Sequence, residues 1–298
     1  MPNDTREGTG AERGNESASN EPPTRNPGAL AVEIVDPRND PDAWDQSISK
    51  FPDANVFHSA GWAQVLCRSY RHQPLYLRFT GEDGEVFAHI PLMEVRSPVT
   101  GRRGVALPFS DFCPPLIQSR PGIDVDPQRH QIREALAGIA QDRAWKYLEV
   151  RGGAIAAPIP PSTPPSFLGH RLDLRIGPES LLANCSSSVR RALRKAEKSS
   201  LEVKIEHSEA AMRQFFRLHT STRRRHGLPP QPYRFFQNIH ETLIQQQLGF
   251  VANAYRPNDG QPVASAVFLT FGDHAVYKFG ASDEQAWDLR PNNLTMWE

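Results

Sequence analysis

The sequence predicts an α/β (α+β) protein made of two tandem domains. Runs of alternating apolar and polar residues, typical of strands, are interspersed with segments that carry apolar residues at helical spacing. This series occurs twice along the 298 residues, and a proline-rich stretch that favours an extended connector separates the two. We therefore expect a disordered tail over residues 1–29, a first domain over 30–151, a linker over 152–166 and a second domain over 167–298.

The composition is that of a globular protein. Hydrophobic residues make up 38% of the chain and charged residues 23%, and 34 basic residues balance 34 acidic ones. No stretch approaches the ~20 apolar residues that a membrane-spanning helix needs. We predict a cytoplasmic protein with no DNA partner and no transmembrane segment. Neither a disulfide framework nor a metal site is expected, because the histidines are isolated and the three cysteines lie far apart: Cys67, Cys113 and Cys185.

Each element of the first domain has its own signal. Asp40 or Asp42 and Ser59 are predicted N-caps of two helices, and the GEDG sequence at 81–84 predicts a hairpin. The expected order is a strand at 31–36, the helix after Asp40 or Asp42, the helix after Ser59, strands at 75–80, 85–95 and 104–107, a helix at 127–143 and a strand at 145–150.

The second domain repeats the alternation and stops as a helix begins. Because the helix after Pro291 has barely two turns before Glu298, we expect this domain to be C-terminally truncated. The expected order is a strand at 171–175, a helix at 186–198, a strand at 201–206, helices at 210–225 and 233–247, strands at 250–255, 263–271 and 275–280, and the last helix.

The helix at 186–198 carries a basic face. Arg191, Arg194 and Lys195 share it, and serines at the helix start add hydroxyl and backbone donors. Between residues 183 and 226 there are eleven Lys and Arg against four Glu, in a chain without net charge. This face is either a binding site for a phosphate or carboxylate group or a solvated basic surface.

Two further segments attract attention. In the loop at 107–116, prolines stiffen the chain around Asp111, which either accepts a proton or forms an Asx-turn. In the strand at 277–282, small residues follow Tyr277. They either allow a ligand to approach the backbone closely or form a tight turn at the end of the strand.

Five segments together resemble the FemAB family, in particular its branch associated with exopolysaccharide and PEP-CTERM/exosortase loci. They occur in the expected order, and the resemblance covers residue 31 to the end of the chain. They are FHSAGW at 57–62, LPFSDFCPPL at 107–116, SVRRALRKAEKSSLEV at 188–203, TRRRHGLPPQPYRFF at 222–236 and YKFGASDEQAWDLRPNNLTMWE at 277–298.

This resemblance implies two GNAT-like domains and transfer of an acyl group from acyl-CoA or aminoacyl-tRNA to an amine. By analogy, the basic face at 191–195 holds a phosphorylated substrate, and Asp111 and Tyr277 are the catalytic candidates. The other substrate-binding candidates lie in the T-x-x-R-x-G element, in the strand that lines the cleft and in the segment after it: Thr222, Arg225, Lys278, Gly280, Ser282 and Asn292.

The expected reaction is direct attack of an amine on a thioester or ester carbonyl, without a covalent enzyme intermediate. No tightly bound cofactor is expected, because the acyl donor is a co-substrate. The expected acceptor is a small molecule or a lipid-linked or nucleotide-linked glycan, and tRNA is a possible partner. The alternative hypothesis is a non-catalytic module that binds a phosphorylated glycan or nucleotide; a weaker one is RNA binding by the arginine-rich helices.

Overall fold

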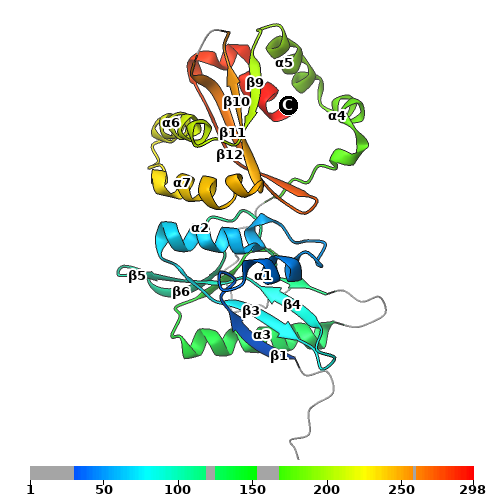
Figure 1. Ribbon diagram of the computed structural model, residues 1–298, viewed down its shortest axis with the longest axis vertical. Helices are drawn as coiled ribbons and strands as arrows, with labels where there is room; N and C mark the ends of the chain where they lie inside the picture. The colour runs from blue at the N-terminus through cyan, green and yellow to red at the C-terminus, as the bar shows by residue number, and fades with distance from the viewer. Residues whose placement is uncertain (1–29, 119–124, 153–167, 258–259) are drawn as a thin grey trace, which may run out of the picture.

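The computed structural model describes residues 30–118, 125–152, 168–257 and 260–298. The predicted tail over 1–29 and all but the first residue of the predicted linker lie outside these residues. The described chain forms two halves, one above the other in Figure 1, and each half has its own sheets and helices.

The first half contains two four-stranded sheets. One has the order β1-β3-β4-β7 and is antiparallel; the other has the order β2-β5-β6-β8, with β6 and β8 parallel. The strands are β1 (Ala31–Val35), β2 (Gln73–Pro74), β3 (Tyr76–Thr80), β4 (Val86–Ile90), β5 (Met93–Ser97), β6 (Gly101–Ala106), β7 (Leu116–Ile117) and β8 (Leu148–Val150). The helices are α1 (Pro41–Ile48), the 3₁₀ turn η1 (Val56–His58), α2 (Ala60–Tyr70) and α3 (Asp126–Asp142).

The second half is built on one antiparallel sheet of order β12-β11-β10-β9. Its strands are β9 (Glu202–Glu206), β10 (Gly249–Tyr255), β11 (Pro262–Phe271) and β12 (His274–Ser282). On one side lie α6 (Glu209–Arg225) and α7 (Tyr233–Thr242). On the other side α8 (Pro291–Trp297) packs on β10 and β11, and α5 (Ser187–Glu197) packs on α8.

A single hydrophobic cluster joins the two halves. Helix α2 of the first half packs against α7 of the second, and Trp62 contacts Phe235 edge-on with their ring centroids 6.0 Å apart. Trp62, Phe215 and Phe236 belong to this cluster and are fully buried. Because apolar burial is the main favourable term in folding, the halves stabilise each other.

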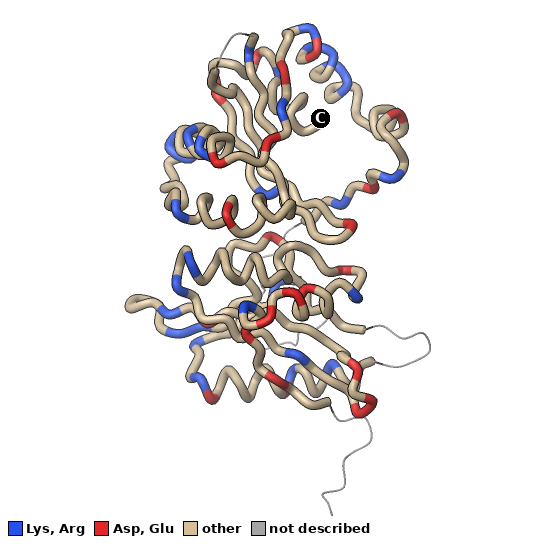
Figure 2. Tube along the Cα trace, viewed as in Figure 1, with Lys and Arg blue, Asp and Glu red and all other residues tan. Residues whose placement is uncertain are grey.

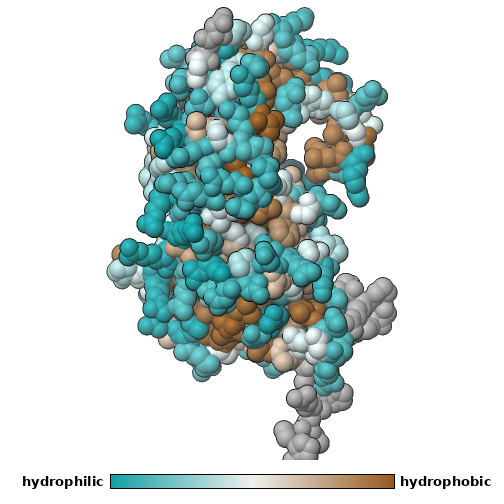
Figure 3. Space-filling model, in the orientation of Figure 1, coloured by the Kyte–Doolittle hydropathy of each residue, from teal (hydrophilic) through white to brown (hydrophobic). Residues whose placement is uncertain are grey.

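Three predicted elements were wrong. The 85–95 strand is divided at Pro91 and Leu92 into β4 and β5, which belong to different sheets. Residues 171–175 form no strand: the chain makes the 3₁₀ turn η2 (Leu174–Ile176) and then α4 (Pro178–Asn184), which was not predicted. Among the described residues no strand pairs with this segment, and its Leu172, Leu174 and Leu182 are exposed, where Figure 3 shows apolar colour on the surface.

The 233–247 helix is also shorter than expected. Helix α7 ends at Thr242 and is followed by the 3₁₀ turn η3 (Ile244–Gln246). Gln247 then adopts a left-handed conformation with φ of 62°, which ends the 3₁₀ turn before the chain enters β10. Another 3₁₀ turn, η4 (Glu284–Leu289), connects β12 to α8.

Candidate functional site

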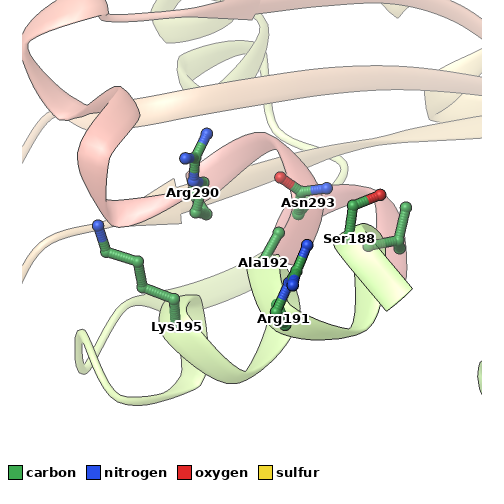
Figure 4. Close-up of a pocket in the computed structure, with 7 residues that line it drawn as sticks. Ser188, Arg191, Ala192, Lys195, Arg290 and Asn293 are labelled. Carbon is green, nitrogen blue, oxygen red and sulfur yellow. The ribbon is translucent and has the colours of Figure 1, made fainter. Parts of the chain in front are cut away.

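A pocket of ≈ 420 Å³ lies between α5 and α8. The Ser186 side chain caps α5 by accepting a hydrogen bond from the Val189 amide, which fixes the start of the helix. Leu193 and Ala196 are buried, and the next face of α5 turns toward α8. The pocket is lined by Ser188, Val189, Arg191, Ala192 and Lys195 of α5 and by Arg290 and Asn293 at the start of α8 (Figure 4).

The pocket is cationic. Arg191, Lys195 and Arg290 line it, and no Asp or Glu of the described residues does. Within the described part of the chain, none of these three side chains makes a hydrogen bond or an ion pair with the protein. Arg190 on the same helix differs, because its guanidinium donates to the carbonyl oxygens of Ala183 and Cys185. Figure 2 shows the Lys and Arg positions gathered along α5.

The pocket agrees only in part with the residues predicted from sequence. Arg191 and Lys195 lie in it, whereas Arg194 is exposed elsewhere on α5 and does not line it. Arg290 and Asn293 were missed. They belong to the R-P-N-N segment that was noted, but their meeting with α5 depends on the packing of two segments about a hundred residues apart.

Ser282, at the end of β12, holds the chain that leads into α8. Its hydroxyl accepts hydrogen bonds from Trp287 Nε1 at 3.0 Å and from Asn292 Nδ2 at 3.1 Å. Its backbone N–H donates to Thr222 Oγ1 at 3.4 Å. Three of the predicted binding residues, Thr222, Ser282 and Asn292, therefore meet, and this network positions the start of α8, where Arg290 and Asn293 lie.

Arg225 joins the same region through Trp287. Its guanidinium carbon lies 4.7 Å from the indole centroid, within the range of a cation–π contact, and its Nη1 lies 4.0 Å from a carboxylate oxygen of Glu284. Arg225 thus packs on the turn between β12 and α8.

Tyr277 lies on the α8 side of the sheet, over Gly280. A Cβ at position 280 would stand 1.9 Å from the Tyr277 hydroxyl oxygen, so a larger residue there would require the tyrosine ring to move. The ring also packs on Phe268, and partial burial raises the pKa of the Tyr277 phenol. The residue is 49% exposed, so one side of it remains open to a ligand.

Asp111 and Lys278 form an ion pair across the two halves. Lys278 Nζ lies 2.8 Å from Asp111 Oδ2; the lysine side chain is 5% exposed and the aspartate side chain 62% exposed. The ammonium also lies over the Phe57 and Phe279 rings, 5.3 and 5.0 Å from their centroids. Burial lowers the pKa of the Lys278 ammonium, and the Asp111 carboxylate acts in the opposite direction.

The loop that carries Asp111 is held from several sides. Trp62 Nε1 donates to the Ser110 hydroxyl at 3.1 Å, and Arg151 donates to the Ser110 carbonyl at 2.8 Å. His58 Nε2 bonds to the Pro114 carbonyl oxygen at 2.8 Å. Asp111 and Lys278 meet at the contact between the halves, whereas Tyr277 contacts Phe268 and Gly280, so the two catalytic candidates have different neighbours.

Comparisons with known proteins agree with this architecture. A family model described as "Acetyltransferase (GNAT) domain" matches residues 183–298. The crystal structure of FemX is similar, with a TM-score of 0.63 at 12% sequence identity over 90% of this chain and 84% of that chain. A GCN5-related glucosamine N-acetyltransferase region of a fungal multi-domain GH3 β-N-acetylglucosaminidase has a TM-score of 0.41 at 8% identity, over 94% of this chain and 34% of that chain. No curated protein matches the chain.

The fold is therefore similar to that of FemX, with tandem GNAT-like domains, and residues 183–298 are similar to GNAT acetyltransferase domains. These findings agree with the GNAT-like fold that the resemblance of the five sequence segments implied. Its described helices include none with the length and apolar character needed to cross a bilayer.

Proposed function

We propose that this protein is an N-acyltransferase that takes its acyl group from a phosphate-bearing donor, either acyl-CoA or aminoacyl-tRNA. The observation that carries the proposal is the α5–α8 pocket, where Arg191, Lys195 and Arg290 have no hydrogen-bond or ion-pair partner among the described residues, within the region that matches the acetyltransferase model. Both donor classes carry phosphates, and Arg and Lys are the side chains that bind them most strongly.

The proposed acceptor is the amine of a small molecule or of a lipid-linked or nucleotide-linked glycan. Its proposed setting is cytoplasmic peptidoglycan, exopolysaccharide or other cell-envelope biosynthesis. The support for this setting is the sequence resemblance to the exopolysaccharide-associated FemAB branch.

In the proposed reaction the acceptor nitrogen attacks the donor carbonyl carbon. A C–N bond forms, the C–S bond of a thioester or the C–O bond of an ester breaks, and the leaving sulfur or oxygen takes a proton. Tyr277, on the α8 side, donates a hydrogen bond to the leaving group. Asp111 lies at the contact between the halves, and the proton lost by the amine reaches it through water.

The test is thermal stabilisation by acetyl-CoA, longer acyl-CoAs and a charged tRNA, followed by mass spectrometry of an amine acceptor mixture. A ligand at 100 times its Kd stabilises the folded state by about 2.7 kcal/mol. We expect one donor class to raise the melting temperature and to yield an acylated amine. Binding without product would favour the non-catalytic module, and neither binding nor product from any donor would refute the proposal.

A further inference from the structure

We infer that the hairpin formed by β5 and β6 docks onto a membrane surface that carries anionic lipids. Its turn, residues 98–100, projects from the side of the first half (Figure 1). In the docked state the apolar side chain of Val99 enters the headgroup layer, and basic side chains around the turn contact the lipid phosphates. This surface belongs to a part of the chain that does not line the α5–α8 pocket, and the inference goes beyond the proposed function.

Val99 lies in the middle of the turn and is 88% exposed. Single exposed apolar residues are common on protein surfaces, so the position of this one is what gives it meaning. Pro98 and Thr100 beside it are also exposed, and the ladder of β5 and β6 supports the turn from behind. An apolar side chain at a supported tip can enter the boundary between headgroups and acyl chains without any change of the fold.

Two cations lie directly at this turn. Arg103 Nη1 donates a hydrogen bond to Thr100 Oγ1 at 2.6 Å, and its guanidinium carbon lies 6.0 Å from the centroid of the Tyr147 ring. Lys146 runs beside the turn, since a Cβ on Gly101 would lie 3.3 Å from Lys146 Nζ. Tyr147 is 47% exposed, and tyrosine is enriched where proteins meet the membrane–water interface.

Two more arginines face each other across the hairpin. Arg96 of β5 and Arg102 of β6 are register partners, and like charges at opposed positions destabilise a strand pair. Glu94, which is buried, pairs with Arg96; among the described residues it is the only carboxylate in an ion pair with any of these four cations. Arg102, Arg103 and Lys146 therefore have no counter-charge there, and folding alone does not account for them.

The geometry favours a lipid surface over a nucleic acid. Successive residues of a strand point to opposite faces, so Arg102 and Arg103 project from the two faces of the hairpin. Figure 2 shows an uncharged tip with Lys and Arg positions behind it. A layer of headgroups met by the tip contacts both faces at once. Val99 gains from removal of its apolar surface from water at the acyl-chain boundary, a gain that a phosphate backbone does not offer.

The experiment is co-sedimentation of the full chain with vesicles of phosphatidylcholine alone or with about one third phosphatidylglycerol. We expect binding to the anionic vesicles only, weakened by added salt because exposed charges are screened. Each basic side chain near an anionic leaflet raises the partition constant about fivefold. The variant R102Q/R103Q/K146Q should therefore lower it about a hundredfold. V99S keeps the charge and should lower it about threefold or more.

The matched control is R194Q/K198Q/R224Q, which removes three exposed cations of the second half and leaves the same net charge. It should change the partition constant less than twofold, and circular dichroism shows that each variant is folded. Equal loss in the two triple variants would show attraction by net charge alone. Unchanged binding of V99S would show that no apolar side chain enters the lipid. Either result overturns the inference.

Two further outcomes would also overturn it. One is failure of the parent chain to bind the anionic vesicles. The other is binding of a transfer RNA that is lost in R102Q/R103Q/K146Q but unchanged in V99S, together with weak or absent vesicle binding, which would make the hairpin an RNA-binding surface. The vesicles contain no acyl donor, so the result does not depend on whether acyl transfer is found.

Discussion

At the scale of single residues, the Asp111–Lys278 pair is unequal. The lysine is nearly enclosed between the Phe57 and Phe279 rings, whereas the carboxylate is mostly open to solvent. A charge left without its partner is expensive only where water cannot replace that partner. The two members of the pair therefore have different consequences when they are removed.

We predict that D111A destabilises the protein more than K278M does. The first change leaves a buried ammonium without its carboxylate and should cost about 1–3 kcal/mol, less than a fully buried pair because one side is solvated. The second replaces the ammonium by an apolar side chain of similar length and frees a carboxylate that water can solvate, so its cost should be under about 1 kcal/mol. Urea unfolding at pH 7 measures both, and a larger loss for K278M would contradict the argument.

Gly280 and Tyr277 provide a second residue-scale prediction. In G280A the new methyl group overlaps the tyrosine hydroxyl, so the ring has to move away from Phe268, at a cost of about 1–3 kcal/mol. The same change made in a Y277A background should cost less than about 0.5 kcal/mol, because the overlap is gone. A double-mutant cycle from urea unfolding gives this coupling, and additive effects would show that the contact is not the cause.

At the scale of elements, the sequence predicted the structure well where the residues that determine an element are neighbours along the chain, as in a helix cap. The caps at Asp40 and Ser59 were each confirmed by a side-chain hydrogen bond to the first turn. The 171–175 segment has the alternation of a strand but no strand beside it, and a pattern of one segment cannot show whether a partner exists. The same reasoning applies to the site: Arg191 was visible as part of a basic helix face, whereas Arg290 becomes a pocket residue only through tertiary packing.

The cap of α5 yields an element-scale prediction. S186A removes the acceptor for the Val189 amide and should cost about 1 kcal/mol of stability, with fraying of the first turn that carries Ser188. S187A is the matched control, since Ser187 is an exposed serine one position later, beyond the cap. Hydrogen exchange of the α5 amides should rise in S186A and stay unchanged in S187A. Equal exchange in the two variants would mean that the cap does not hold the helix.

At the scale of the whole molecule, buried histidines make stability depend on pH. Burial lowers the pKa of His58 to about 4 and that of His89 to about 3, while burial raises the pKa of Asp45 to about 6. Below pH 6.5 these two histidines bind protons in the unfolded chain but stay neutral in the folded chain. Their contribution to the free energy of unfolding is therefore fully present above pH 6.5 and falls on acidification. Asp45 has the opposite sign, because its folded form holds a proton between about pH 4 and 6 that the unfolded form has lost.

Each unit of pKa shift is worth about 1.4 kcal/mol. On acidification the two histidines lose more stabilisation than Asp45 gains. We therefore predict that the free energy of unfolding falls by roughly 3 kcal/mol between pH 7 and pH 4.5. D45N keeps an oxygen to accept the Ala60 amide but removes the opposing titration. The loss on acidification should therefore be larger in D45N than in the parent protein. Urea unfolding at both pH values tests this, and a smaller loss in D45N would reverse the assigned sign.

The shared hydrophobic cluster predicts that both halves unfold together. Helix α2 approaches α7 so closely that a Cβ on Gly61 would lie 2.7 Å from Leu243 Cδ2. A G61V substitution should force the helices apart and cost about 1–3 kcal/mol. Since Trp62, Phe235 and their neighbours belong to one cluster, the whole transition should move to lower urea while remaining single, with tryptophan fluorescence and far-ultraviolet circular dichroism coinciding. Two separated transitions in the parent protein would show that each half folds on its own core. Separation only in G61V would show instead that the α2–α7 contact is what couples them.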